Sequence, residues 1–389
     1  MKSLVGVLVY AAVLAGACGS ADGSGTSATV APTTTVAPTT TVAPTTTVAP
    51  TTTVAPTTTV APTTTVWVVH NTTLETVGDV GVYSSLTIGV DSNPLISHTD
   101  ISNSDLELYV CDDPACSSGT NVTLETVAVV GGSSSIAIGV DGNPVIAYTD
   151  ATRDAWELEG CEDPACGGDL ALYVCDDPAC SSGTSVTLET TGSVGWDTSI
   201  AIGVDGNPAI SHYDDTNEDL ELYVCDDPAC SSGTNVTLET DGNVGFRGSL
   251  VIGVTGNPVI SHMDRANEDL ELYVCDDPAC SSGANVTLET SGSVGWDPAV
   301  TISDNGNPVI SHGRWDWDEA DGDLELYVCD NPACSSGTNV PLVTTGSVGV
   351  FSSITIGDDG NPIIAHQEYA KGDLEFAQVM MPVSVVAYQ

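Results

Sequence analysis

The stretch that decides the fold is Ser199-Ile-Ala-Ile-Gly-Val-Asp-Gly-Asn-Pro-Ala-Ile-Ser-His-Tyr-Asp214. Its alternating apolar residues predict two short strands, at Ile200–Val204 and Ala209–Asp214. Between them, Asp205-Gly206-Asn207-Pro208 predicts a hairpin turn, because Gly206 accepts positive φ without steric cost. The unit is completed by two further alternating segments, Leu220–Cys225 and Val236–Thr240.

This unit recurs along the chain, and each copy carries the pair Asn-Pro. The pairs begin at residues 93, 143, 207, 257, 307 and 361, so the intervals are 50, 64, 50, 50 and 54. A local duplication accounts for the interval of 64, since Glu157–Cys166 is echoed by Leu172–Cys180. Four strands in about 50 residues, six times over, predict an all-β fold, a six-bladed β-propeller of four-stranded antiparallel blades over residues 67–389. A superhelical β-solenoid is the alternative.

The ends of the array bear on how such a ring closes. The last repeat, after Leu374–Val379, lacks the cysteine loop that precedes every other outer strand. We expect the N-terminal segment Thr73–Val77 to complete the sixth blade, with Val383–Tyr388 as the competing strand.

The N-terminal residues predict export. Residues 1–17 form a lipoprotein-type signal peptide, with Lys2 followed by an apolar run too short to span a bilayer. Leu14-Ala-Gly-Ala-Cys18 resembles a bacterial lipobox, which implies acylation of Cys18; ordinary signal-peptidase cleavage is the alternative. After a short linker at 18–29, residues 30–66 repeat Val-Ala-Pro-Thr-Thr-Thr. Regular prolines without charge predict a disordered stalk about 100 Å long when extended at ~3.1 Å per residue.

Twelve cysteines follow the stalk as six Cys-x-x-x-x-Cys pairs. Even number, export and identical spacing predict local disulfides, whereas zinc would need four ligands around one ion. The pairs are Cys111–Cys116, Cys161–Cys166, Cys175–Cys180, Cys225–Cys230, Cys275–Cys280 and Cys329–Cys334.

The six repeats resemble the repeat propellers of the sialidase-like superfamily, which occur in many bacterial surface proteins. The residues that carry the resemblance are Ser199–Asp214 and the five related stretches. The Asp-box of sialidases, Ser-x-Asp-x-Gly-x-x-Trp, is absent from the sequence. Sialidases clamp their substrate with three arginines, and here no arginine precedes Arg153. The resemblance therefore implies a propeller without the sialidase catalytic set.

Two sets of recurring side chains could bind metal ions. A histidine stands near the end of each second strand, with Tyr148 in the second repeat, and we expect these side chains to form hydrogen bonds between blades. Carboxylates flank the following loops, where solvated turns and calcium sites are the two interpretations. The histidines are His98, His212, His262, His312 and His366, and the carboxylates are Asp100, Asp105, Asp214, Asp219, Asp264 and Asp269.

Aromatic residues and a few cations provide the candidate binding face. In such blades we expect the interblade connections and the loops between second and third strands on one face, and the cysteine loops on the other. The aromatics appear at matching places in the interblade connections, and the fifth-repeat insertion adds two tryptophans to the same face. Sugars and peptide side chains are the ligands that such platforms hold, although packing between blades would also use aromatic fillers. The candidate residues are Tyr83, Trp196, Phe246, Trp296, Phe351, Trp315, Trp317, Arg153, Arg265 and Arg314.

Together these features predict a non-catalytic binding module for an extracellular glycan or surface protein. A glycan-cleaving enzyme of sialidase or lyase type and a structural adhesion protein are the alternatives. With 53 acidic and six basic residues, the net charge of −47 excludes nucleic acid as a partner. The 41% of hydrophobic residues supports a folded core, and we expect a monomer without a required cofactor.

The acidic excess generates a prediction about stability. Like charges repel within the folded chain, and salt screens this repulsion. The melting temperature should therefore rise when NaCl or CaCl₂ is added. A flat or falling melting temperature across the titration would contradict the prediction, and saturation at micromolar calcium would indicate specific calcium sites.

Overall fold

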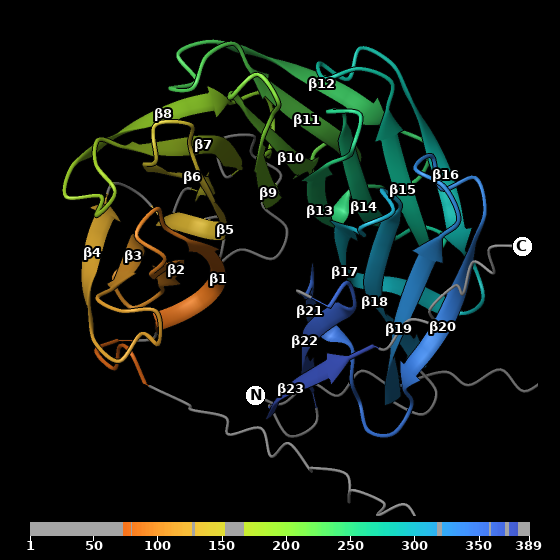
Figure 1. The fold of residues 1–389 in the computed structure, drawn as a ribbon. Coiled ribbons are helices and arrows are strands. Elements are labelled where there is room, and N and C mark those ends of the chain that lie inside the picture. The colour runs from red at the N-terminus through yellow and green to blue at the C-terminus, as the bar shows by residue number, and fades with distance from the viewer. Residues whose placement is uncertain are drawn as a thin grey trace, which may run out of the picture. The chain divides into compact units, whose positions relative to one another are not determined.

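The computed structural model describes residues 73–78, 80–126, 129–151, 167–316, 321–357, 359–369 and 373–379. These residues form strands, turns and bends, arranged as six antiparallel sheets around a common centre (Figure 1). The six-bladed propeller predicted from the repeats is confirmed. Within the described part of the chain, no helix has the length and apolar character needed to cross a membrane.

Each blade runs from an inner to an outer strand. The first blade contains β1 (Val80–Ile88), β2 (Pro94–Asp100), β3 (Asp105–Cys111) and β4 (Gly119–Glu125). The second contains β5 (Val129–Ile138), β6 (Pro144–Ala151), β7 (Gly168–Cys175) and β8 (Gly183–Glu189). The third contains β9 (Trp196–Ile202), β10 (Pro208–Asp214), β11 (Asp219–Cys225) and β12 (Gly233–Glu239). The fourth contains β13 (Phe246–Ile252), β14 (Pro258–Asp264), β15 (Asp269–Cys275) and β16 (Gly283–Glu289). The fifth contains β17 (Ser293–Ile302), β18 (Pro308–Asp316), β19 (Asp321–Cys329) and β20 (Gly337–Val343). The sixth contains β21 (Val350–Ile356), β22 (Pro362–Glu368) and β23 (Asp373–Gln378).

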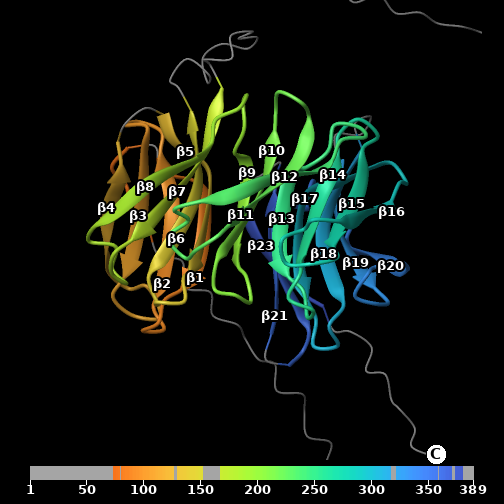
Figure 2. The same cartoon turned by 90° about the horizontal axis from the view of Figure 1, so that it is seen from above.

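The loops lie at two ends of the strands, as seen from the side in Figure 2. At one end, the connection between blades contacts the loop between the second and third strands. There the Ser193 amide donates a hydrogen bond to the Thr216 hydroxyl at 2.6 Å. At the other end, the first hairpin turn meets the cysteine loop, where Asn257 Nδ2 donates to the Cys275 carbonyl at 3.1 Å. The sequence placed these two loop sets on opposite faces, and this arrangement is confirmed.

The hydrophobic core is divided among the blade interfaces. Five clusters of buried side chains occur, one between each consecutive pair of blades from the first to the sixth. Between the second and third blades, for example, Leu172 packs in one cluster with Ile200 and Ile210. Burial of each such side chain stabilises the fold by roughly 1.5–3 kcal/mol, so the blades depend on their neighbours.

Serine hydroxyls connect the inner strands across these interfaces. The amide of Leu250 donates to Ser199 Oγ of the preceding blade at 3.0 Å, and the Ile200 amide donates to Ser135 Oγ at 3.2 Å. In the reverse direction, Ser352 Oγ donates to the carbonyl of Asp297 at 2.9 Å. From the first blade to the sixth, neighbouring inner strands therefore share hydrogen bonds through serine side chains, although they form no common sheet.

Five disulfides close the cysteine loops in the described residues. The pairs Cys111–Cys116, Cys175–Cys180, Cys225–Cys230, Cys275–Cys280 and Cys329–Cys334 each join residues five apart. The pairing predicted from the spacing is confirmed for these five, while Cys161–Cys166 lies outside the described residues. Because such bonds persist in oxidising compartments, they indicate an extracytoplasmic protein.

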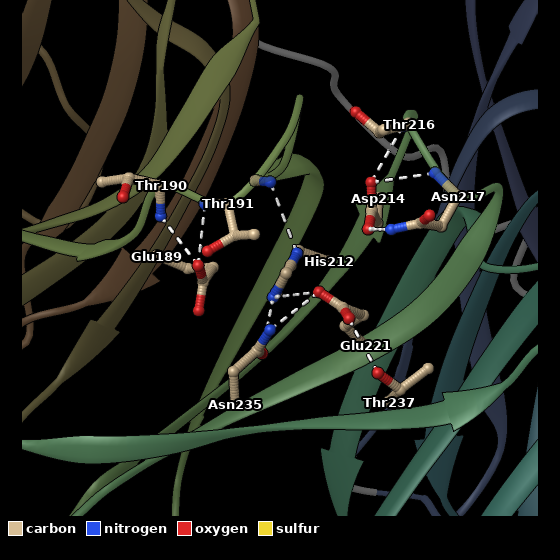
Figure 3. Close-up of polar contacts among 11 residues, drawn as sticks. Glu189, Thr190, Thr191, His212, Asp214, Thr216, Asn217, Glu221, Asn235 and Thr237 are labelled. Carbon is tan, nitrogen blue, oxygen red and sulfur yellow. Dashed lines mark hydrogen bonds and ion pairs between the residues drawn. The ribbon is translucent and has the colours of Figure 1, made fainter. Parts of the chain in front are cut away.

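The recurring histidines bond within their own blades. In the third blade, His212 Nδ1 accepts from the Gly195 amide at 3.3 Å, so its Nε2–H donates to Asn235 Oδ1 at 3.1 Å (Figure 3). The Asn235 amide donates in turn to Glu221 Oε2 at 2.8 Å. All four residues belong to one blade, so the predicted interblade hydrogen bonds were wrong. The network positions a neutral imidazole that joins the inner strand to the outer one.

The segment expected to complete the sixth blade forms no strand. Residues 73–76 lie outside any sheet, and β23 ends a three-stranded sheet in the described chain. Glu75 nevertheless accepts the amides of Thr76 and Val77, as Glu189 accepts those of Thr190 and Thr191. The segment thus has the local structure of an outer strand's end without the pairing, and the competing Val383–Tyr388 lies outside the described residues.

Side chains of β1 are more exposed than their counterparts on the other inner strands, because no described strand covers that side of the first blade. Leu86 is 60% exposed, whereas its counterpart Ile200 is 7% exposed because the preceding blade covers it. A gap between β1 and β21 is visible in Figure 1. The first blade therefore lacks, in the described part, the cover that the other inner strands receive.

The histidine network generates a prediction about pH. Burial lowers the pKa of His212 below its ordinary 6.5, so the unfolded chain takes up a proton before the folded one does. Stability should fall as the pH decreases below about 6.5, by up to about 1.4 kcal/mol per pH unit for this one group.

The second blade shows how to design a variant without the histidine. There Tyr148, Ser185 and Ala171 occupy the places of His212, Asn235 and Glu221, and the Tyr148 hydroxyl is hydrogen-bonded to Ser185. The triple variant His212→Tyr, Glu221→Ala and Asn235→Ser copies that arrangement. Denaturant unfolding between pH 7 and 5 should show a shallower loss of stability in the variant than in the wild type. Identical slopes would contradict the assignment of a neutral His212.

Candidate functional site

A cavity of about 550 Å³ opens where the six inner strands converge. Every residue that lines it lies on β1, β5, β9, β13, β17 or β21. Hydroxyls are the commonest polar groups of the wall, and aromatic rings, two carboxylates and one arginine stand among them. The serines are Ser84, Ser85, Ser133, Ser134, Ser135, Ser199, Ser249, Ser352 and Ser353.

One backbone position, repeated six times, presents the most varied side chains to this cavity. Each inner strand bulges here, so that one residue adopts positive φ between 45° and 54°. Few residues other than glycine adopt this conformation, and its recurrence identifies equivalent positions independently of residue type. The six residues are Tyr83, Ser133, Asp197, Arg247, Asp297 and Phe351.

The five aromatic residues that the sequence placed at matching positions are therefore not all equivalent. Tyr83 and Phe351 lie at the bulge position, whereas Trp196, Phe246 and Trp296 precede it by one residue. The five aromatics therefore form two classes. Tyr83 and Phe351 are 42% and 60% exposed, while the other three are only partly exposed beside their strands.

Arg247 is the central cation of the site, and the sequence analysis left it out of the binding face. Its guanidinium forms an ion pair with Asp297 of the next blade. The guanidinium carbon also lies 5.2 Å from the ring centroid of Phe351 and 5.9 Å from that of Trp296. An aromatic cage around a paired guanidinium is a favourable cation–π arrangement.

The two carboxylates support the backbone of the following blade. Asp197 Oδ2 accepts the Arg247 amide at 2.9 Å, and Asp297 Oδ2 accepts the Phe351 amide at 2.8 Å. Burial raises the pKa of Asp197, while the amide and guanidinium of Arg247 act to lower it. Burial likewise raises the pKa of the Tyr83 phenol, with a smaller contribution from Asp197.

The two tryptophans share a local structure but not an environment. Trp196 Nε1 donates to Ser193 Oγ at 2.9 Å, and Trp296 Nε1 donates to Ser293 Oγ at 2.8 Å. Trp196 lines the cavity, whereas Trp296 lies under the guanidinium and does not. Both indoles are half-buried, so they also serve as packing between blades.

The remaining predicted face residues do not reach the cavity. Arg265 stacks on Phe246 from outside, with its guanidinium carbon 5.0 Å from the ring centroid. Arg314 Nη1 lies 3.7 Å from Glu325 Oε1, and the Trp315 ring packs edge-on against the Tyr369 ring. Arg153 and Trp317 lie outside the described residues.

The carboxylates considered for calcium serve as turn acceptors. Asp214 accepts the amides of Thr216 and Asn217 and the Asn217 side chain, all within 3.2 Å (Figure 3). Asp100 and Asp264 repeat this arrangement. Their strand partners are Asp105, Asp219 and Asp269, whose pKa values burial raises. Within the part of the chain that the structure describes, no three acidic, histidine or cysteine residues are grouped to hold a metal ion.

Comparison with known proteins supports the architecture. No protein-family model and no curated protein sequence matches the chain. Among solved structures, the NanB sialidase of Streptococcus pneumoniae matches with a TM-score of 0.52 and 9% identity over 76% of this chain. The match covers 66% of that sialidase chain. An α-L-arabinofuranosidase of Fusarium graminearum matches with a TM-score of 0.51 and 10% identity, over 77% of this chain and 92% of the other. The chain therefore has the sialidase-like six-bladed propeller fold.

Proposed function

We propose that the protein is a non-catalytic binding module of the cell surface, with its ligand site in the cavity at the centre of the ring. The observation that carries this proposal is that six side chains of five types, presented from one repeated backbone position, surround a single cavity. Concave sites with aromatic walls and a few oriented polar groups are typical of ligand binding.

The chemistry of the wall favours binding over catalysis. Arg247 and Asp297 are paired with each other, which leaves neither as an independent anion clamp or general acid. Among the described residues that line the cavity, Arg247 is the one cation, so they contain no cluster of arginines that could face a substrate carboxylate. A glycan-cleaving enzyme remains the alternative, and conversion of a panel of glycosides would establish it.

Display at the surface is the second part of the proposal. Acylation of Cys18 would anchor the chain, and the Thr/Pro stalk would hold the ring away from the membrane. Metabolic labelling with a fatty acid tests the anchor, because replacing Cys18 with serine should abolish the label and release the protein.

Two variants test the cavity as the binding site. Tyr83→Ser and Phe351→Ser place at each bulge the residue that the second blade carries naturally, as Ser133 with the same positive φ. Since both rings are exposed, the free energy of unfolding should change by no more than about 1 kcal/mol, with the larger loss at Phe351, which gives up its cation–π contact with Arg247. A ligand identified on a glycan and protein array should bind at least tenfold more weakly to each variant, a loss of about 1.4 kcal/mol.

The control is Val204→Ser, in the first hairpin turn at the far end of the same inner strand layer, where the side chain is 71% exposed. It should bind like the wild type. Equal affinity of all three variants and the wild type, with unchanged melting, would place the ligand elsewhere.

A further inference from the structure

We propose that Trp196 and Asp197 form a binding site for the guanidinium group of an arginine side chain on a basic partner polypeptide. This inference rests on the proposed function, since it names the ligand chemistry of the same cavity. Its basis is the internal repetition of the fold, which places the same pair of residues in two blades.

The fifth blade shows how such a pair holds a guanidinium. There Trp296 and Asp297 receive Arg247 from the bulge position of the preceding blade. The carboxylate forms the ion pair and the indole lies 5.9 Å from the guanidinium carbon. The chain thus contains its own example of arginine recognition in this cavity.

The third blade repeats the tryptophan and the aspartate of this arrangement, and the blade after it carries Arg247 where the blade after the fifth carries Phe351. Trp196 and Asp197 occupy the positions of Trp296 and Asp297, with the same indole-to-serine hydrogen bond and the same positive φ at the aspartate. The preceding blade, however, carries Ser133 where the fourth blade carries Arg247. Because serine is short and neutral, the bulge position of the second blade does not provide a guanidinium as Arg247 does.

The lining of the cavity differs between the third and fifth blades accordingly. Trp196 lines the cavity, whereas the Arg247 guanidinium lies over Trp296. Asp197 also lines it, and one of its oxygens accepts the Arg247 amide. Two carboxylates and one cation line the cavity, so a second guanidinium would balance the charge.

The charge of the whole chain favours the same class of partner. With 53 acidic and six basic residues, the protein attracts basic polypeptides over distances near the Debye length and repels anionic ligands. An arginine combines this attraction with a planar group that stacks on indole and pairs with carboxylate.

The test uses the peptide acetyl-Gly-Arg-Gly-amide and the same peptide with citrulline, which keeps the shape of arginine and lacks its charge. Calorimetry on the full chain should show one arginine peptide bound per protein and at least tenfold weaker binding of the citrulline peptide. Glucosamine and N-acetylglucosamine serve as competitors, and stronger binding of glucosamine than of the arginine peptide would overturn the assignment to a polypeptide.

Three variants locate the site. Ser133→Arg should fill it from within and reduce binding at least tenfold; positive φ is no obstacle, because Arg247 adopts it at the equivalent position. Asp197→Asn, which keeps the acceptor for the Arg247 amide, should weaken binding to a similar degree. Arg247→Ser should raise the stoichiometry from one peptide to two, because it gives the fifth blade the arrangement of the third.

Melting curves confirm that each variant is folded. Unchanged affinity in both Ser133→Arg and Asp197→Asn, or equal binding of the citrulline peptide, would overturn the inference. If an array ligand still depends on Tyr83 and Phe351 in that case, the proposed function survives; if no ligand of any kind binds, both fail.

Discussion

The structure depends on how the inner edge of each blade is satisfied. A sheet that ends at the centre of a ring presents amides and carbonyls that no further strand can pair. Here short hydroxyl side chains take that role, as when the Leu250 amide donates to Ser199 of the previous blade. Serine at these positions keeps the centre narrow and polar. The hydrophobic clusters can then lie between the blades, and the inner ends of the strands are left to form a cavity wall.

The architecture could be read from the sequence because its signals are local and repeated. Turn residues such as Asp205-Gly206-Asn207-Pro208 mark the first hairpin, and the spacing of Cys225 and Cys230 marks the third loop. Six copies of each signal make the period unmistakable, even with two insertions. The loop faces and the disulfide partners followed from the same repetition.

The site was harder to predict because a bulge removes the regularity on which alternation depends. Each inner strand contains one non-glycine residue with positive φ, and the residues before it no longer keep the strand period. Tyr83 was therefore aligned with Trp196, although its structural counterpart is Asp197. The constant Gly195, Gly245 and Gly295 before this position were the available signal. Arg247 was missed for a related reason, since Asp297 and Phe351, which hold its guanidinium, lie in the fifth and sixth blades and are 50 residues or more away in sequence.

The histidine networks explain why the blades tolerate change at the centre. His212 joins the inner strand, through Gly195, to Asn235 on the outer strand, so this connection does not use the residue at the bulge position. The second blade achieves the same with Tyr148 and Ser185. In both blades the inner part of the sheet is thereby tied to the outer strand by residues other than the one at the bulge.

The bulge position has a consequence for how such a protein can diversify. Tyrosine, serine, aspartate, arginine and phenylalanine all occupy it with one backbone conformation. The ring therefore presents six equivalent positions, at each of which a single codon change alters a side chain of the cavity wall while the backbone conformation stays as it is. Duplication of one blade copies such a position together with the strands that hold it.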